Sequence, residues 1–404
     1  MELSFQQKLF YFFPVLFCFC LPFGSLVLSV IIILWGLTSF LNIDKSKLKA
    51  GFYNKNFWLL ALFFFVTCIS AAFSNNKTEA LTSIENKLGF LVLPYYFFCF
   101  SWPSQIIKKC MVSFVSGCFF ACMYLIFRAA AFAFNGHPEH FFYTAFSDLI
   151  HTSYFAMYLI LAISIVFLYY HEWFSQQKQY TYISAFFIAV FTITIFLCYS
   201  KMGIITFFIC LPVLIFYRWR SIFNFKKAIL LFAGVTLLMV VAVKLFPGAF
   251  NRLNSITSFS MDSIDKTSSE STTVRVLIWE QCLSIIKNNF LFGVTVGDAN
   301  DALYKAYEQN GLTGALEHKL NAHNQYFQTF IGLGMIGFLL LSALTFGQFI
   351  KAVLRKNILL LIFSILIVLN FVVESMLQRA DGILFFVFFF CLFNLDKIND
   401  EISS

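Results

Sequence analysis

Charged side chains are scarce in this sequence of 404 residues. Asp, Glu, Lys and Arg together make up 12% of it, about half the share found in an ordinary soluble domain. Hydrophobic residues make up 60%, and the mean hydropathy is +0.80. No water-soluble core could bury that much apolar surface, so the composition excludes a soluble globular protein. It predicts an all-α integral membrane protein, because a helix satisfies its own backbone hydrogen bonds in lipid.

Cysteine pairs and metal-binding motifs are also lacking. Of the 11 cysteines, only Cys282 falls away from the long apolar runs, where no second cysteine can pair with it, so we expect no structural disulfide. There is no C-x-x-C pair, and the histidines between positions 137 and 151 do not have the spacing of a zinc site. We therefore expect neither a metal nor a cofactor.

Apolar runs long enough to cross a bilayer recur along the whole chain, since a spanning helix needs ~20 mostly apolar residues. Pro22 and Gly24 interrupt the first run, residues 9–41, which is longer than the core of a cleaved signal peptide and is expected to stay as a helical hairpin. The sequence predicts twelve membrane helices, at residues 8–22, 24–42, 57–73, 87–101, 109–134, 152–171, 180–199, 202–217, 228–246, 323–349, 357–373 and 382–395.

The lysines and arginines indicate which side of the membrane each connection faces. With the N-terminus in the cytoplasm, the cytoplasmic connections collect Lys8, Lys45, Lys47, Lys49, Lys55, Lys108, Lys109, Lys178, Arg218, Arg220, Lys226, Lys227, Lys351, Arg355, Lys356 and Lys397. Few acids accompany these cations, and the remaining acids fall on the opposite side. This positive-inside distribution predicts that both termini are cytoplasmic. The net charge of +8 therefore indicates topology and not nucleic-acid binding.

One connection on the predicted outer side is exceptionally long, residues 247–322. Its first part, residues 251–273, is rich in Ser, Thr and Asn and is expected to be mobile. Residues 273–288 carry apolar side chains at helical spacing, and we expect this helix to lie along the membrane surface. The loop divides the chain into three predicted parts, an N-terminal bundle at 1–246, a periplasmic loop at 247–322, and C-terminal membrane helices with a cytoplasmic tail at 323–404.

The second half of this connection has clear start and stop signals. Gly293 and Gly297 predict a turn, residues 298–309 a second helix, and Gly311 the C-cap of that helix. A long loop with structure of its own is usually functional.

Ionisable side chains are almost absent from the predicted helix interiors. A pump or coupled transporter carries charged or His residues deep in its helices, because ions must be handed across the bilayer. Here they gather at or above the predicted outer interface, at Lys87, His137, His140, His151, Lys201, Arg275, His323, Glu374 and Arg379. This distribution favours chemistry on a membrane-anchored substrate over passage through the membrane.

His323 and Arg275 are the first candidate site residues. His323 opens the predicted helix at 323–349, where it could be a base at the membrane mouth or a helix cap. On a continuous helix, Gly334 would lie three turns beneath it on the same face and Gly337 slightly to one side, so that a helix or acyl chain could approach closely. Arg275 lies near a helix N-terminus, where its guanidinium suits a phosphate or a lipid headgroup.

Three further charges lie in short predicted outer turns. Lys201 lies between two predicted helices. It could bind an anion, or it could anchor the helix end at the membrane interface. Glu374 and Arg379 share another turn and could pair with each other.

A spaced set of motifs covers residues 272–340. His323-Asn324 is followed after nine residues by Gly334-Met-Ile-Gly337, and it is preceded by Arg275-Val-Leu-Ile-Trp279 and by Phe292-Gly-Val-Thr-Val-Gly297. The set resembles the His-Asn-x9-Gly-x-x-Gly, Arg-x3-Trp and Gly-Val-Gly elements of the O-antigen ligase and O-antigen polymerase superfamily. It departs from the last element, whose middle glycine is displaced to Gly297 and whose preceding proline is absent.

The resemblance implies a membrane glycosyltransferase of the C type, working without a metal at the periplasmic face of the bacterial inner membrane. Such enzymes move a glycan from undecaprenyl diphosphate to an acceptor hydroxyl, which in the ligases belongs to a sugar of the lipid A core. Arg275 would then hold the diphosphate, and His323 would activate or orient the acceptor hydroxyl. The supporting residues would be Trp279, Asn324, Gly334, Gly337 and Glu374.

The family's second arginine, in a Ser-Arg pair, corresponds to Lys201 in Ser200-Lys201. Lysine keeps the positive charge but loses the bidentate geometry of arginine. Arg379 is a further outer cation that could meet the diphosphate, whose developing negative charge must be balanced by protein cations when no metal is present.

Within this class the sequence favours a ligase, and a polymerase that uses a second lipid-linked repeat as its acceptor is the alternative. A lipid-linked glycan flippase would require cations along a path through the bilayer, and the sequence has too few. A non-enzymatic partner in a polysaccharide assembly machine is a third alternative.

Overall fold

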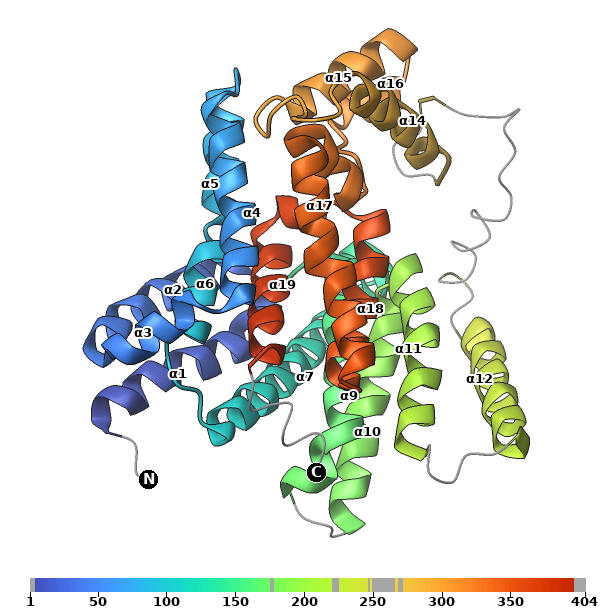
Figure 1. The fold of residues 1–404 in the computed structure, drawn as a ribbon. Coiled ribbons are helices and arrows are strands. Elements are labelled where there is room, and N and C mark those ends of the chain that lie inside the picture. Colours follow the sequence, from blue (N-terminus) through green and yellow to red (C-terminus); the bar gives the residue numbers. More distant parts are fainter. Residues whose placement is uncertain are drawn as a thin grey trace. The chain divides into compact units, whose positions relative to one another are not determined.

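The computed structural model describes residues 4–174, 178–219, 225–245, 248, 266–267 and 272–395. Within these ranges every regular element is a helix (Figure 1), which confirms the predicted all-α class. The segment expected to be mobile lies almost entirely outside the described residues, as does the predicted cytoplasmic tail after residue 395.

Each of the twelve predicted apolar stretches coincides with one helix. These helices are α1 (Phe5–Cys20), α2 (Ser25–Ser39), α4 (Lys55–Ala72), α6 (Gly89–Phe98), α7 (Ser104–Phe134), α9 (Thr152–Phe174), α10 (Lys178–Leu197), α11 (Lys201–Trp219), α12 (Phe225–Leu245), α17 (Gln325–Leu354), α18 (Ile358–Val373) and α19 (Ala380–Phe393). Pro22 and Gly24 break the first run as predicted, because a short 3-10 turn and a glycine at φ 102° separate α1 from α2.

Seven helices, counted over the described residues, are long and apolar enough to cross a membrane: α1, α2, α4, α7, α9, α11 and α17. By contrast, α6 has 10 residues, α19 has 14 and α18 has 16. At about 1.5 Å per residue they fall short of the ~30 Å hydrocarbon core. The helices support a multi-pass membrane protein, while the count of twelve spans stays a prediction.

The contacts divide the chain into two compact units. Unit 1 comprises residues 1–42, 102–253 and 355–366, and unit 2 comprises residues 43–101, 254–354 and 367–404. The three-part division along the chain stays a prediction.

Unit 1 is built around the buried helix α9. The central stretch of α9 is almost wholly buried, and α7, α10 and α11 pack against it. A second contact joins α1 to α7, where Gly117 allows a close approach: a Cβ atom there would lie 2.1 Å from the carbonyl oxygen of Phe19. The short elements η3 (Pro138–Phe141) and α8 (Tyr143–Phe146) follow α7, and η2 (Phe40–Asn42) follows α2.

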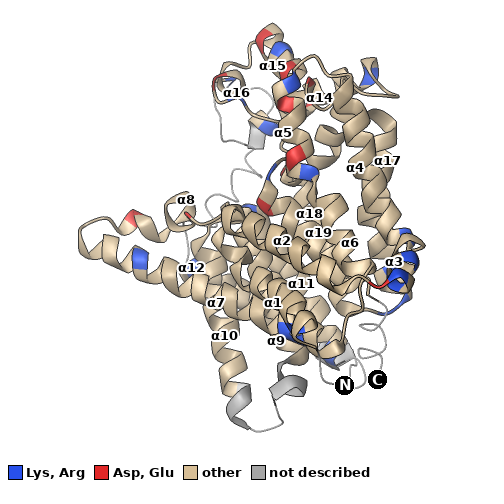
Figure 2. Cartoon of the chain, turned by 90° about the vertical axis from the view of Figure 1, so that its left-hand side faces the viewer, with Lys and Arg blue, Asp and Glu red and all other residues tan. Residues whose placement is uncertain are grey.

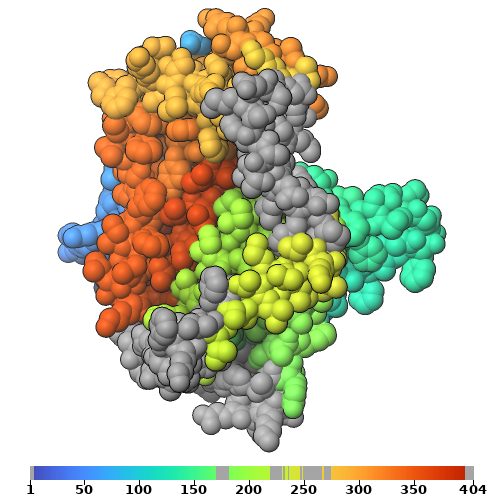
Figure 3. Space-filling model, turned by 90° about the vertical axis from the view of Figure 1, so that its right-hand side faces the viewer, coloured from blue at the N-terminus to red at the C-terminus, as the bar shows by residue number. Residues whose placement is uncertain are grey.

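Unit 2 contains α4, α6, α17 and α19, together with α3 (Lys45–Phe52), α5 (Lys77–Lys87), α14 (Thr272–Asn288), α15 (Ala299–Asn310), α16 (Thr313–Glu317) and η6 (Met376–Gln378). Helix α4 packs against α5, α6 and α17, and α19 is buried from Gly382 to Phe393. Lysines gather on α3, and charges of both signs lie over α14–α16 (Figure 2). In Figure 3 the α14–α16 segment, in yellow to light orange, gathers over one end of α17.

The α14–α16 segment has a hydrophobic core of its own. The apolar residues predicted at helical spacing on α14 are all buried, and Leu303 and Tyr307 of α15 and Phe330 and Ile331 of α17 pack with them. The positions of α14 and α15 and the C-cap at Gly311, with φ 68°, confirm the sequence prediction. Protein therefore covers the apolar face of α14. The expectation that this helix lies along the membrane surface stays a prediction. Helical periodicity reveals an apolar face but not what covers it.

Candidate functional site

His323 lies immediately before α17 and not inside it. The helix begins at Gln325, and Asn324 acts as its N-cap, because the Asn324 Oδ1 atom accepts a hydrogen bond from the Phe327 N–H at 3.1 Å. His323 itself has φ 43°, and Asn321 Oδ1 accepts a hydrogen bond from its N–H at 2.9 Å. Asn324 therefore caps the helix, and the imidazole of His323 is available for another role.

Two side chains hold the backbone in front of His323. The indole N–H of Trp279 donates to the carbonyl oxygen of Ala322 at 3.0 Å, and Gln328 Oε1 accepts from the Ala322 N–H at 3.0 Å. On α14, Trp279 lies four residues after Arg275, which places both on one face of the helix. The Arg-x3-Trp spacing thus ties the position of Arg275 to the segment that carries His323.

Glu374 joins Arg275 to His323. Its Oε1 accepts a hydrogen bond from Arg275 Nη2 at 3.2 Å, and its Oε2 lies 3.6 Å from His323 Nδ1. The Glu374 side chain is 13% exposed, whereas that of Arg275 is 33% and that of His323 is 24% exposed. The carboxylate is therefore the most buried of the three groups, and the guanidinium and the imidazole stay accessible to a substrate.

The alternative in which Glu374 pairs with Arg379 is wrong, because the Glu374 carboxylate turns to Arg275 and His323 instead. Arg379 is exposed and is the residue before α19. Among the described residues no ion pair involves its guanidinium, so it remains a candidate for contact with an anion.

Backbone hydrogen bonds join the glycine-containing 291–297 turn to the glycine-containing part of α17. Gly334, at φ 63° and ψ −159°, breaks the helix. In a regular helix the Met335 N–H would donate to the Ile331 carbonyl, and here it does not. Instead the Val294 N–H donates to the Ile331 carbonyl at 2.7 Å, and the Met335 N–H donates to the Phe290 carbonyl at 2.9 Å. The expectation of a continuous helix, with Gly334 three turns beneath His323, is therefore wrong. The close approach predicted at Gly334 comes from the backbone of this turn.

Gly337 and Gly293 complete this junction. A Cβ atom on Gly337 would lie 2.2 Å from the Leu333 side chain, and one on Gly293 would lie 2.4 Å from the Ile331 carbonyl oxygen. The displaced Gly297 lies against the turn between α4 and α5, where its N–H donates to Ser74 Oγ at 3.1 Å. Close backbone packing therefore explains Gly293 and Gly297, whereas Gly337 leaves room for the Leu333 side chain of its own helix.

Asp298 fastens the same turn to the chain between α4 and α5. Its carboxylate accepts hydrogen bonds from the N–H groups of Asn75 and Asn76, at 2.9 and 2.8 Å, and from Thr295 Oγ1 at 2.8 Å. Burial acts to raise the pKa of Asp298, but these donors outweigh it and hold the pKa below its usual value. The 291–297 turn is therefore attached both to α17 and to the chain that follows α4.

We expect Gly334→Ala to lower the melting temperature of the protein in detergent by about 2 °C or more. Alanine cannot adopt this backbone conformation without strain, which costs roughly 1–3 kcal/mol, and its Cβ would lie 2.3 Å from the Leu291 carbonyl oxygen. Gly347→Ala is the matched control on the same helix, because a Cβ atom there meets nothing within 4 Å. Equal melting temperatures for the two variants would contradict the interlocked junction.

Lys201 belongs to unit 1, at the first position of α11. The preceding Ser200 is buried, and its Oγ accepts a hydrogen bond from the Gly203 N–H at 3.1 Å, so it caps the helix. Tyr199, at φ 48°, turns the chain between α10 and α11. Lys201 and the Arg275–Glu374–His323 cluster lie in different units, so its role beside Arg275 stays a prediction.

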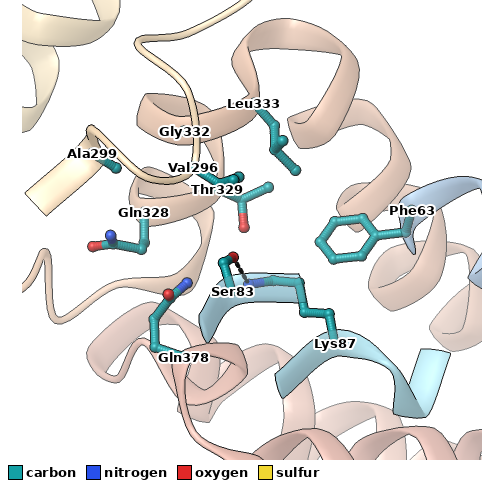
Figure 4. Close-up of a pocket in the computed structure, with 10 residues that line it drawn as sticks. All are labelled: Phe63, Ser83, Lys87, Val296, Ala299, Gln328, Thr329, Gly332, Leu333 and Gln378. Carbon is teal, nitrogen blue, oxygen red and sulfur yellow. Dashed lines mark hydrogen bonds between the residues drawn. The ribbon is translucent and has the colours of Figure 1, made fainter. Parts of the chain in front are cut away.

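One charged residue was placed at the predicted outer interface from the sequence but was not predicted to belong to the site. Lys87, the last residue of α5, is buried and lines a small open pocket with Ser83, Gln328, Thr329 and Gln378 (Figure 4). The sequence places it at the edge of an apolar run, which is where an interface lysine normally lies. Only the packing of α5 against the rest of unit 2 reveals its burial.

No group of three or more His, Cys, Asp or Glu side chains is arranged to hold a metal within the described ranges. The groups that the cluster itself offers are the guanidinium, the carboxylate and the imidazole just described.

The fold and the cluster define a class of protein, an α-helical multi-pass membrane protein with a polar site at the junction of α14, α17 and the segment before α19. Residues 184–342 match the family model of O-antigen ligase, which confirms the resemblance to that superfamily. The match supports a membrane glycosyltransferase of the O-antigen ligase or polymerase type. It includes Lys201, Arg275 and His323 and ends before Glu374. No curated protein matches the chain significantly.

Proposed function

We propose that this protein transfers a glycan from undecaprenyl diphosphate to a hydroxyl group of an acceptor glycan, as an O-antigen ligase does with a sugar of the lipid A core. The observation that carries the proposal is the contact of one carboxylate, Glu374, with both Arg275 and His323. The family match supports the reaction class. The site would face the periplasm from the bacterial inner membrane, with both termini in the cytoplasm.

In this reaction His323 acts as the general base. Its Nδ1 is turned to Glu374, which leaves Nε2 for the acceptor hydroxyl. As the acceptor oxygen bonds to the anomeric carbon, the hydroxyl proton passes to Nε2, and Glu374 stabilises the imidazolium that forms. The electron pair of the broken bond leaves with the diphosphate.

Arg275 holds the departing diphosphate. One edge of its guanidinium is fixed by Glu374, and the rest of its side chain is partly exposed. A guanidinium held in this way can present further N–H donors to two phosphate oxygens, and it stabilises the charge that develops as the diphosphate leaves. Trp279 and Asn324 maintain the geometry, because they fix the backbone on either side of His323.

The proposal is tested with the purified full-length protein in detergent, a lipid diphosphate-linked glycan and a lipid A-core acceptor. We expect transfer, and we expect it to persist in EDTA if the protein cations suffice. Absence of transfer with both lipid A-core and lipid-linked acceptors would refute the proposal.

A deletion strain separates the ligase from the polymerase. Free polymer accumulating on the carrier lipid indicates a ligase, whereas single repeats joined to the core indicate a polymerase. Failure of the carrier-linked glycan to reach the outer face would instead indicate a flippase.

For Lys201 we expect the arginine variant to keep most of the activity and Lys201→Ala to lose at least tenfold. The reason is that a cation held near the diphosphate contributes mainly through its charge, which arginine retains. The initial rate of glycan transfer is the measurement. Lys244→Ala, which removes an exposed lysine from the last turn of α12, is the control. Equal rates for the arginine and alanine variants would make Lys201 an interface anchor only.

A further inference from the structure

A lysine with no carboxylate partner is buried in unit 2. Lys87 is 3% exposed, and its Nζ donates one hydrogen bond, to Ser83 Oγ at 2.9 Å. No Asp or Glu of the described ranges forms an ion pair with it. An ammonium group has three N–H donors. Two of them therefore remain for a group that enters the pocket.

Burial of this charge does not stabilise the fold. A buried cation without a counter-ion destabilises the folded state, and an apolar side chain of similar length would be more stable there. The position of Lys87 is therefore better explained by a ligand than by packing.

The pocket around Lys87 offers further polar groups to a small anion. Ser83 and Thr329 contribute hydroxyl groups, Gln378 contributes a carboxamide, and Phe63 and Leu333 form apolar walls (Figure 4). The side chain of Gln378 makes no hydrogen bond within the described part of the chain. No other charged or titratable residue lines this small pocket.

Two lining residues connect this pocket to the candidate site. Gln328 Oε1 accepts a hydrogen bond from the N–H of Ala322, the residue before His323. Gln378 is the last residue of the η6 turn, which follows Glu374. Gln325 joins these two segments, because its Oε1 accepts the Leu377 N–H at 2.6 Å. The pocket and the Arg275–Glu374–His323 cluster therefore share the start of α17 and the η6 turn.

We propose that the Lys87 pocket is a phosphate-binding subsite, in which the ammonium group, the Ser83 and Thr329 hydroxyls and the Gln378 amide receive the oxygens of one phosphoryl group. A lysine ammonium is a common point-charge ligand for phosphate. The inference rests on the proposed function only for the source of that group, which would be the diphosphate of the lipid-linked donor or of the released carrier.

The test is equilibrium binding of inorganic pyrophosphate and of farnesyl diphosphate to the full-length protein in detergent, by titration calorimetry. We expect Lys87→Met to weaken binding of farnesyl diphosphate at least tenfold. Lys77→Met is the matched control, because Lys77 begins the same helix but is exposed. Repeating both titrations with Arg275→Ala separates the contribution of Lys87 from that of Arg275.

A loss confined to farnesyl diphosphate would assign the subsite to the lipid carrier, and an equal loss for pyrophosphate would extend it to free phosphates. Unchanged affinities in Lys87→Met, or no binding of either compound to the unmodified protein, would overturn the inference. Both titrations are independent of glycan transfer, so an inactive protein that still binds diphosphate through Lys87 would refute the proposed function alone.

The melting temperature distinguishes a ligand-binding lysine from a structural one. We expect Lys87→Met to melt at the same temperature as the unmodified protein or higher, because the variant removes a desolvated charge. A structural lysine would give a lower melting temperature with unchanged affinity. If Lys87→Met does not accumulate, Gln378→Ala gives a second measurement, with binding expected to weaken at least threefold and an unchanged affinity overturning the inference.

Discussion

His323→Ala is expected to lower the initial rate of glycan transfer at least a hundredfold while the protein remains inserted and folded. A positioned general base contributes about 10²–10⁴ to a rate. The side chain is partly exposed and does not cap α17, so its removal leaves Asn324 and the helix start in place. The measurement is transfer from a lipid diphosphate donor by the purified variant, together with its melting temperature.

Two further variants show whether the imidazole itself is responsible. His318→Ala removes an exposed histidine of the same segment and is expected to leave the rate unchanged. Glu374→Gln keeps the shape of the side chain but removes the charge that faces His323 Nδ1 and Arg275, and we expect a tenfold to hundredfold loss. A normal rate in His323→Ala would eliminate the proposed base.

Arg275→Ala should have the second large effect, a loss of about a hundredfold or more in kcat/KM for the lipid-linked donor. The guanidinium holds the diphosphate both when the donor binds and when the bond breaks, so we expect KM to rise and kcat to fall. Arg275→Lys should recover part of the activity, because it restores the charge without the bidentate geometry.

A variant of an exposed lysine on the same helix is the control for the Arg275 variants. Lys287→Ala, in the last turn of α14, should leave both kinetic constants unchanged. Loss of the Arg275–Glu374 ion pair should cost about 1 kcal/mol, since the pair is only partly buried. Wild-type kcat/KM in Arg275→Ala would show that the diphosphate is held elsewhere.

Local sequence patterns determined the helices of this protein. In lipid every backbone amide must bond within its own helix, so an apolar run of sufficient length specifies a helix without reference to the rest of the chain. The same holds for α15, whose end was predicted at Gly311 because only glycine readily adopts the left-handed conformation of that cap. The motif spacing around Arg275 and His323 likewise needed no tertiary information.

The partners of the charged side chains were decided by the tertiary structure alone. The sequence left open a pair between Glu374 and Arg379, its neighbour in the turn, but Glu374 contacts Arg275, 99 positions earlier in the chain. Gly334 was predicted to lie within a regular helix, but the 291–297 turn takes over its hydrogen bonds. The sequence placed Lys87 at the predicted outer interface but did not reveal its burial, because burial depends on which helices pack around a residue. Apolar runs act through neighbours in the chain, whereas an ion pair or a backbone junction depends on neighbours in space.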